Sequence, residues 1–264
     1  MNDAGSSALL TLTSLGDVAR LVLVVAVCAL LAALVRRVAG LGAGRDELVA
    51  VARATGQLAA VGLVIAVVLQ SWWATAAFLA LMVLVAAWTS AGRMGVTGGG
   101  WLTRARAWVV VPIALGAIPV TLGLLGSGLL PLVPIAVIPT AGILIGNAMT
   151  ATTLAGKRSL EAIVERRGEF EAGLSIGLLP RDAALLVSRD AARLALLPGL
   201  DQTRTVGLVT LPGAFVGTLL GGATPLEAAA LQLVVLAGIL LSQSIAVALV
   251  LELVVRGMVR PLPG

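Results

Sequence analysis

Long apolar stretches dominate this sequence and decide what kind of structure it can form. A helix needs about 20 mostly apolar residues to cross the roughly 30 Å hydrocarbon core of a bilayer. Stretches of about this length lie at 18–35, 55–70, 72–88, 107–125, 131–154, 205–222 and 228–255. Only 12% of the residues are charged, against about 25% in a typical soluble domain. We therefore expect an all-α, polytopic membrane protein with about seven transmembrane helices, forming a single domain over residues 1–264.

The positions of the basic residues indicate how such a chain is oriented. The second stretch is short, but it could begin near Glu47 if Arg53 extends towards the headgroups. With the N-terminus outside, all basic residues except Arg20 fall in the cytoplasmic segments. Because cytoplasmic loops carry the excess of Lys and Arg, we predict an outer N-terminus and a cytoplasmic C-terminus in the inner (plasma) membrane. The net charge of +5 is then a signal of orientation, and we expect the lipid bilayer, not nucleic acid, as the partner.

One loop, residues 156–204, is long enough to form structure of its own on the cytoplasmic side. Leu160, Ile163, Val164, Phe170 and Leu174 recur at helical spacing, so the fifth stretch is expected to continue as an amphipathic helix. A second helix is predicted from Pro180 or Arg181 to Leu197, with Gly173 and Gly177 loosening the connection before it and Pro198-Gly199 stopping it. Its segment AALLVSRDAARLALL is too apolar for a free surface helix, so it should bury one face.

The composition excludes several kinds of chemistry. The sequence has no histidine and a single cysteine, Cys28, so a catalytic histidine, a Cys/His zinc site and an internal disulfide are ruled out. A glycine-rich phosphate loop ending in Gly-Lys-Ser/Thr is also missing, and Lys157 stands in AGKRS without it. We expect no catalytic residue, metal site or cofactor in this chain. ATP-driven activity would need a second polypeptide to hold ATP and Mg²⁺.

The polar residues within the stretches are mostly uncharged. Glu227 and Glu252 lie near the ends of the last stretch, away from the midplane, which weakens an ion-coupled carrier. Neutral polar side chains commonly bond neighbouring helices together, and they can also line a path for a solute. The candidates for such a translocation path are Asn147, Met149, Thr150, Gln57, Thr218 and Gln232.

Glycines recur at helical spacing in two of the stretches. They are Gly142 and Gly146 in the fifth, and Gly213, Gly217 and Gly221 in the sixth. Such smooth faces favour close packing of helices. Pro139 and Pro212 add points at which the same two helices can bend. Because these helices flank the long loop, a force on the loop could change their arrangement in the membrane.

Several segments resemble a known family. The segments IPTAGILIGNAMTATTLA (138–155), ALLPGLDQTRTVGLVTLPGAFVGTLLGGATPLEAAALQ (195–232) and, more weakly, DELVAVARATGQLAAVGLV (46–64) resemble the FetB family of ABC transporter permeases. That family is associated with iron export and includes plant permeases linked to aluminium tolerance. The resemblance implies a permease that works with a cytoplasmic ABC ATPase, which holds ATP and Mg²⁺, as two copies of each subunit.

The long loop also looks like a degenerate form of the ABC permease coupling motif, in which Glu-Ala-Ala is followed after three residues by Gly. Here Glu171, Ala172 and Gly173 are followed by Gly177. By this resemblance, the segment from Glu171 to Arg181 would couple to the ATPase by inserting into a cleft on it.

The sequence departs from the family where a substrate would be recognised. The family typically reads L-P-G-M-M-T-G-Q, whereas this chain has LPGAFVGT at 211–218. The loss of two thioethers and a glutamine leaves few metal ligands, which weighs against directly coordinated iron. We expect export of a metal ion, a metal chelate or another small solute. The alternative is a secondary carrier or channel that acts alone.

Overall fold

The computed structural model describes residues 14–96 and 104–259 of the chain. Within these ranges, six helices are long and apolar enough to cross a membrane. This result confirms the expected all-α, multi-pass membrane protein. The helices group into two compact units, Met1–Gln70 and Ser71–Gly264.

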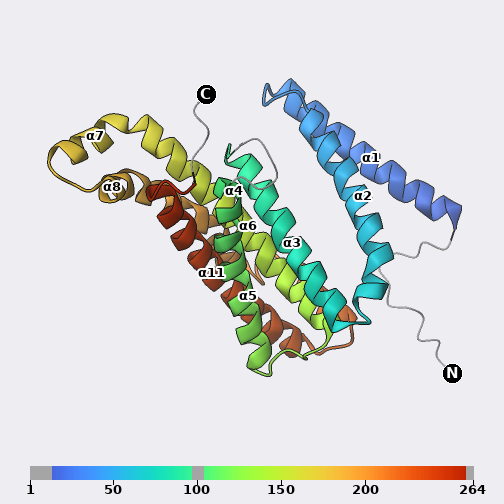
Figure 1. Ribbon diagram of the computed structural model, residues 1–264. Coiled ribbons are helices and arrows are strands. Elements are labelled where there is room, and N and C mark those ends of the chain that lie inside the picture. The colour runs from blue at the N-terminus through green and yellow to red at the C-terminus, as the bar shows by residue number, and fades with distance from the viewer. Residues whose placement is uncertain (1–13, 97–103, 260–264) are drawn as a thin grey trace, which may run out of the picture. The chain divides into compact units, whose positions relative to one another are not determined.

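The first unit is a hairpin of α1 (Leu15–Val38) and α2 (Arg45–Val68) (Figure 1). Helix α2 starts ten residues before the stretch at 55–70, which confirms that the second span can extend past Glu47. The turn needs Gly44, because its φ is +69° and a Cβ there would overlap the backbone carbonyl of Ala33. Arg36 fastens the hairpin by binding Glu47 at 2.6 Å and Asp46 at 3.3 Å.

The second unit is a bundle built on α3 (Trp72–Arg93), α5 (Val110–Gly126), α6 (Pro134–Glu165) and α11 (Pro225–Val255), with the short α4 (Arg104–Trp108) before α5. Its core is tightly packed around Ile113, Leu144 and Leu236, none of which is more than 1% exposed. Glycines allow this close approach: a Cβ on Gly116 would lie 2.8 Å from the carbonyl oxygen of Ser242.

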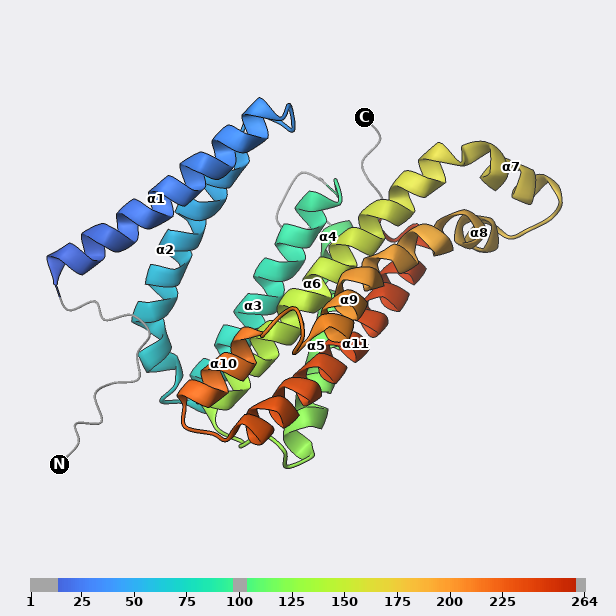
Figure 2. The same cartoon turned by 180° about the vertical axis from the view of Figure 1, so that it is seen from behind.

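A helical hairpin projects from one end of this bundle (Figures 1 and 2). Helix α6 continues well past the stretch at 131–154, as the sequence predicted, but it ends at Glu165, and a break at Arg166 separates it from α7 (Arg167–Ser175). Helix α8 (Pro180–Arg193) starts where it was predicted and ends before the predicted Leu197. We name α7 and α8 the α7–α8 hairpin, and the end that carries it the hairpin end. Arg93 and Lys157 line one pocket at this end. The predicted burial of one face of α8 is confirmed at Ala183, Ala184, Val187, Ser188 and Ala192.

The predicted stop at Pro198-Gly199 is wrong. After a short 3₁₀ turn, η1 (Leu194–Leu196), the chain enters α9 (Leu197–Thr205) with Pro198 in its first turn. The first N–H groups of a helix have no partner within it, so proline is tolerated there. The proline therefore begins a helix instead of ending one.

The stretch at 205–222 is also not the single helix that was predicted. Helix α9 ends at Thr205, and α10 (Gly213–Leu220) begins only after a turn at 206–212. Gly207 adopts a φ of +83° in this turn, and Pro212 has the extended conformation of a helix N-cap. Because proline has no N–H and disfavours helix in the residue before it, the helix is interrupted here. Figure 2 shows α9 and α10 running along α6 towards the start of α11.

Candidate functional site

A groove of about 810 Å³ lies between α6, α9, α10 and α11, and we name it the polar groove. It collects three of the predicted path residues: Asn147, Thr218 and Gln232. Thr140 and Gln202 add two further polar side chains. The rest of the lining is apolar or glycine and includes Pro139, Pro212, Gly213 and Gly217. Two stretches of the sequence, 130–147 and 202–239, thus form one site with few polar groups, as is usual for small-molecule sites.

Asn147 is held in place by a hydrogen bond between helices. Its Oδ1 accepts a bond from Nε2 of Gln243 at 3.1 Å, and its Nδ2 donates to the carbonyl of Ile143 at 2.9 Å. Gln243 is only 4% exposed, and Gly199 of α9 packs directly against its amide, where a Cβ would overlap it. The absence of a side chain at Gly199 therefore lets α9 lie on α11 beside Asn147.

Gln232 is the most unusual group at the polar groove. The residue is only 5% exposed, and its Oε1 has no hydrogen-bond partner among the described residues. A buried acceptor without a partner costs about 1–3 kcal/mol. Oε1 of Gln243, on the same helix, is buried without a partner as well, so this feature is shared by a residue outside the groove.

The hydroxyl protons of the two threonines in the groove are engaged in hydrogen bonds within their own helices. The hydroxyl of Thr140 donates to the carbonyl of Ala136 at 2.8 Å, and that of Thr218 donates to the carbonyl of Ala214 at 2.7 Å. A hydroxyl has one proton and two lone pairs. Both oxygens can consequently act towards the groove only as acceptors.

Three predicted path residues are not among the residues that line the groove. Met149 packs against the hydrophobic core of the bundle. Thr150 is exposed and donates to the carbonyl of Gly146 on its own helix at 3.0 Å. Gln57 is exposed on α2, in the other compact unit. Gln202 lines the groove instead, and it was missed because the sequence placed it in a loop.

The glycines that recur at helical spacing in the fifth and sixth stretches do not lie at the closest contacts between helices of this chain. A Cβ on Gly142 would lie 3.2 Å from Cε of Met82, but one on Gly146, Gly213 or Gly217 would meet nothing within 4 Å. Gly221 approaches only the carbonyls of its own helix. Gly213 and Gly217 instead widen the polar groove, because α10 turns them towards it.

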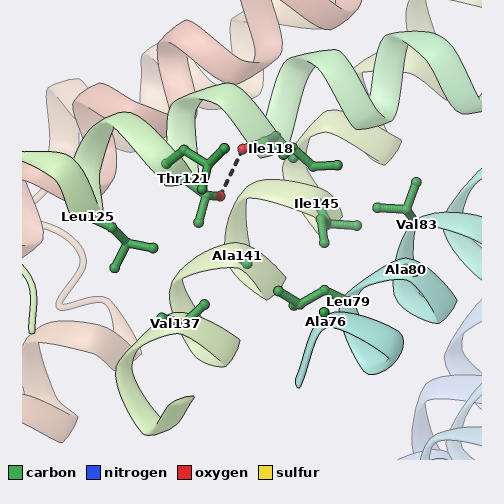
Figure 3. Close-up of a pocket in the computed structure, with 12 residues that line it drawn as sticks. Ala76, Leu79, Ala80, Val83, Ile118, Thr121, Leu125, Val137, Ala141 and Ile145 are labelled. Atoms are coloured by element: carbon green, nitrogen blue, oxygen red, sulfur yellow. Dashed lines mark hydrogen bonds between the residues drawn. The ribbon is translucent and has the colours of Figure 1, made fainter. Parts of the chain in front are cut away.

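A smaller pocket, of about 250 Å³, lies between α3, α5 and α6 and is almost entirely apolar (Figure 3). Among the described residues that line it, Thr121 has the one hydroxyl, which donates to the carbonyl of Ala117 at 2.8 Å. The labelled side chains in Figure 3 are otherwise hydrocarbon. With no group to orient a polar solute, this pocket is a poorer candidate than the polar groove.

The α7–α8 hairpin is bound to α11 by a charged pair. Arg181 on α8 donates from Nε to Oε1 of Glu252 at 2.8 Å and from Nη2 to Oε2 at 2.7 Å. Arg256 donates to the same carboxylate at 2.5 Å. The hydrogen bond and charge of Glu252 raise the pKa of Arg181 above its usual value. Paired in this way, Arg181 ties the hairpin to the helix that carries Gln232 and Gln243.

The residues of the predicted coupling motif lie on α7 and in the turn after it. Gly173 is buried against α8, where a Cβ would lie 3.3 Å from that of Ala183, and Gly177 has a φ of +92° that favours glycine. Glu171 and Ala172 are exposed, and Glu171 binds Arg167 at 2.8 Å.

Large apolar side chains are exposed where the hairpin turns and on its outer face. Ile176 is 81% exposed and Leu179 is 68% exposed, and Leu186 on α8 is 62% exposed. We name Ile176, Leu179 and Leu186 the hairpin tip. Large exposed apolar patches mark interaction sites, so the hairpin tip is a candidate docking surface.

Comparisons with known proteins agree on one family. The family described as "Uncharacterised protein family (UPF0014)" matches residues 18–259. The chain is 38% identical over 200 residues to "UPF0014 membrane protein STAR2" of Oryza sativa subsp. japonica, covering 74% of this chain and 68% of that protein. It is 34% identical over 194 residues to "Protein ALUMINUM SENSITIVE 3" of Arabidopsis thaliana, with 72% and 69% of the two chains covered.

A bacterial relative has a more specific name. The chain is 32% identical over 193 residues to "Probable iron export permease protein FetB" of Escherichia coli (strain K12), covering 72% of this chain and 73% of the relative. No solved structure matches the chain.

Proposed function

We propose, since this chain belongs to the UPF0014 family, that it is the membrane-spanning permease subunit of an ATP-driven (ABC) transporter. In this proposal the chain carries a solute across the membrane through the polar groove. A separate cytoplasmic ATPase subunit binds ATP and Mg²⁺ and docks on the α7–α8 hairpin. The transported solute is a metal ion, a metal chelate or another small solute, and the direction is export.

The observation that carries this proposal is that a single helix serves both sites. Helix α11 presents Gln232 to the polar groove and holds Arg181 of the hairpin through Glu252. Along α11, Glu252 lies about 30 Å from Gln232 at about 1.5 Å per residue. A movement of the hairpin would therefore be passed to the groove along a stiff, continuous element. This is the mechanical link that an ATP-driven permease needs.

The position of α9 supports a polar environment beside its charged face, which is not part of the polar groove. Gly199 packs against Gln243, which lies about 27 Å along α11 from Pro225 at about 1.5 Å per residue. Farther along α9, Asp201 and Arg204 form a 3.4 Å ion pair whose side chains are 67% and 69% exposed. At membrane depth, charged side chains face a water-filled cavity or a protein interior and avoid lipid. This face of α9 would therefore border the water of the path or a second copy of the permease.

The charges at the hairpin end support its assignment to the cytoplasm. Arg93, Lys157 and Arg256 gather there on three helices. By the preference of basic residues for the cytoplasmic side, the hairpin end lies inside the cell and the C-terminus with it. In this orientation the exposed hairpin tip lies in the cytoplasm, where the ATPase subunit can bind it. Two permeases and two ATPase subunits would form the transporter of the inner (plasma) membrane.

The test is to reconstitute the chain with and without an ABC ATPase expressed alongside it. We expect a tagged chain to capture the ATPase from detergent extracts, and proteoliposomes containing both to take up or release a metal ion only when ATP is hydrolysed. The matched control is the same pair with the catalytic glutamate of the ATPase replaced by glutamine. Transport by the chain alone, driven by an ion gradient, would instead establish the secondary carrier.

A further inference from the structure

An acidic and a basic residue lie deep in the membrane-spanning part of the second unit. They are Asp201 and Arg204 on α9, and Gln202 between them lines the polar groove. Asn147 lines the same groove, and at about 1.5 Å per residue it is about 14 Å and about 20 Å from the two ends of the uncharged part of α6, 134–156. Asp201 and Arg204, which we name the α9 charge pair, therefore lie near the middle of the bilayer.

The α9 charge pair is not covered by the second unit. The side chain of Asp201 is 67% exposed and that of Arg204 is 69% exposed. Among the described residues they share one bond, of 3.4 Å, between Nη1 of the arginine and Oδ1 of the aspartate. A guanidinium has five N–H donors, so most of them remain open, as does the second carboxylate oxygen. Ionised groups at this depth avoid lipid and face protein or water.

The rest of the chain offers no charged partner at this depth. Residues 21–35 of α1 and 54–68 of α2 contain no Asp, Glu, Lys or Arg. In the second unit, none of the eight residues of α10 is charged, and none of them is buried. A protein partner for the α9 charge pair therefore comes from another chain. A second copy of this chain brings both an acid and a base.

We infer that a second copy packs against α9, so that Asp201 of each copy pairs with Arg204 of the other. This inference rests on the two-copy permease of the proposed function and names the surface through which the copies meet. In a two-fold dimer with its axis along the membrane normal, equivalent residues lie at the same depth. Arg204 already reaches back to Asp201 in its own helix, so the four charges can gather at one level with alternating sign.

Water in a cavity is the other environment that can hold these charges. The two environments differ in how charge reversal on one copy affects the other copy. In a water-filled cavity, the charges of one chain are indifferent to those of its neighbour. Across an interface, like charges repel and opposite charges attract, so the charges decide which chains associate.

The test therefore exchanges charges between copies. Two full-length chains with different tags are expressed together without an ATPase, solubilised in detergent and captured through one tag. Asp201→Arg leaves two positive charges on α9 and Arg204→Asp leaves two negative charges, so each variant loses the bond within its own helix. We expect each variant to capture itself at least 5-fold less than the parent does. A mixture of the two variants should recover at least half of the parent's capture. Mixed capture no greater than that of either variant alone would overturn the inference.

The matched control is the same exchange at Asp190 and Arg193, an exposed pair on α8 with the same spacing and an N–O distance of 4.0 Å. Asp190→Arg, Arg193→Asp and their mixture should all leave capture between copies unchanged. Thermal unfolding of each variant shows that it is folded. Equal losses at the two pairs would show that added charge disturbs association from any position, and would overturn the inference.

A disulfide tests the same contact while both charges stay in place. Thr205 is one turn after Asp201 on the same face of α9, and its hydroxyl donates only to the carbonyl of that residue among the described residues. In a Cys28→Ser background, we expect oxidation in membranes to link Thr205→Cys into dimers. Leu115→Cys, half exposed on α5, should stay unlinked. The reverse pattern would place the contact on another face and overturn the inference.

The outcome is separate from that of the proposed function. Single copies that still capture an ATPase would overturn the inference and leave the ATPase partnership standing. Copies linked through α9 that capture no ATPase would support the inference and count against that partnership.

Discussion

Arg181 and Glu252 meet across 71 positions of sequence through two hydrogen bonds of 2.8 and 2.7 Å. Two such bonds fix the plane of the guanidinium against the carboxylate, so the pair sets an orientation as well as a distance. The side chains are 43% and 31% exposed, and a partly exposed ion pair contributes no more than about 1 kcal/mol to stability. We therefore expect its main effect on the link between the α7–α8 hairpin and α11.

Replacing Arg181 by lysine tests this link, because lysine keeps the charge but cannot form both bonds. We expect ATP-driven transport in proteoliposomes to fall roughly tenfold, equivalent to about 1.4 kcal/mol, while ATPase capture is retained. Arg167→Lys is the control, since Arg167 binds Glu171 within α7. Full transport by Arg181→Lys would show that the pair does not couple the two sites.

Gly199→Ala tests the contact between α9 and α11. The new methyl group would overlap the amide of Gln243, and overpacking of this kind costs about 1–3 kcal/mol. We expect a lower thermal midpoint, and a double-mutant cycle with Gln243→Ala should show that the two changes are coupled. Gly146→Ala is the control, because a Cβ there meets nothing within 4 Å. Additive effects in the cycle would contradict the contact.

Asn147→Ala tests the polar link between α6 and α11. The change removes the acceptor of Nε2 of Gln243 and leaves a buried amide unpaired, at a cost of about 1–3 kcal/mol. The measurement is the free energy of unfolding in mixed micelles. Thr150→Ala, three residues along the same helix and exposed, should change this energy by less than about 0.5 kcal/mol. Equal effects of the two substitutions would argue against the link.

The hairpin tip is tested by the double variant Ile176→Asp with Leu179→Asp. Both side chains are largely exposed, so the fold should keep its thermal midpoint, while capture of the ATPase in a pull-down should be lost. Val164→Asp is a suitable control, because Val164 is 70% exposed on α6 and outside the tip. A double variant that still captured the ATPase normally would move the docking surface elsewhere.

The orientation is tested with single cysteines in a Cys28→Ser background, since Cys28 is the sole cysteine and is exposed. Ser175→Cys at the hairpin should react with a membrane-impermeant maleimide only in inside-out vesicles. Ser127→Cys, after α5 at the opposite end of the bundle, should react only in intact cells. The reverse pattern of labelling would invert the proposed topology.

Hydropathy was sufficient to predict most of the helices, and the helical spacing of apolar residues predicted the extension of α6 beyond the bundle. It failed at 205–222, because an apolar window does not register that Gly207 and Pro212 interrupt the backbone hydrogen bonds of a helix. The same limit explains why Pro198 was misread: a proline stops one helix and starts another equally well.

The candidate site could be predicted only in part. Asn147, Thr218 and Gln232 were selected as uncharged polar residues in apolar stretches, and the structure brings them to one groove. The partner of Asn147 could not be chosen in this way, because Gln243 is one of several similar residues on α11 and is selected by packing against Gly199. Contacts between segments this far apart are set by the tertiary fold.

The interrupted segment between α9 and α10 has a consequence for the order of assembly. The turn at 206–212 lacks the continuous backbone hydrogen bonds of a helix. Backbone N–H and C=O groups without hydrogen-bond partners are not stable in hydrocarbon. The segment leaves the ribosome after α6 but before α11, and both of these helices border the groove beside it. The groove is therefore complete only after α11 has been inserted beside this segment.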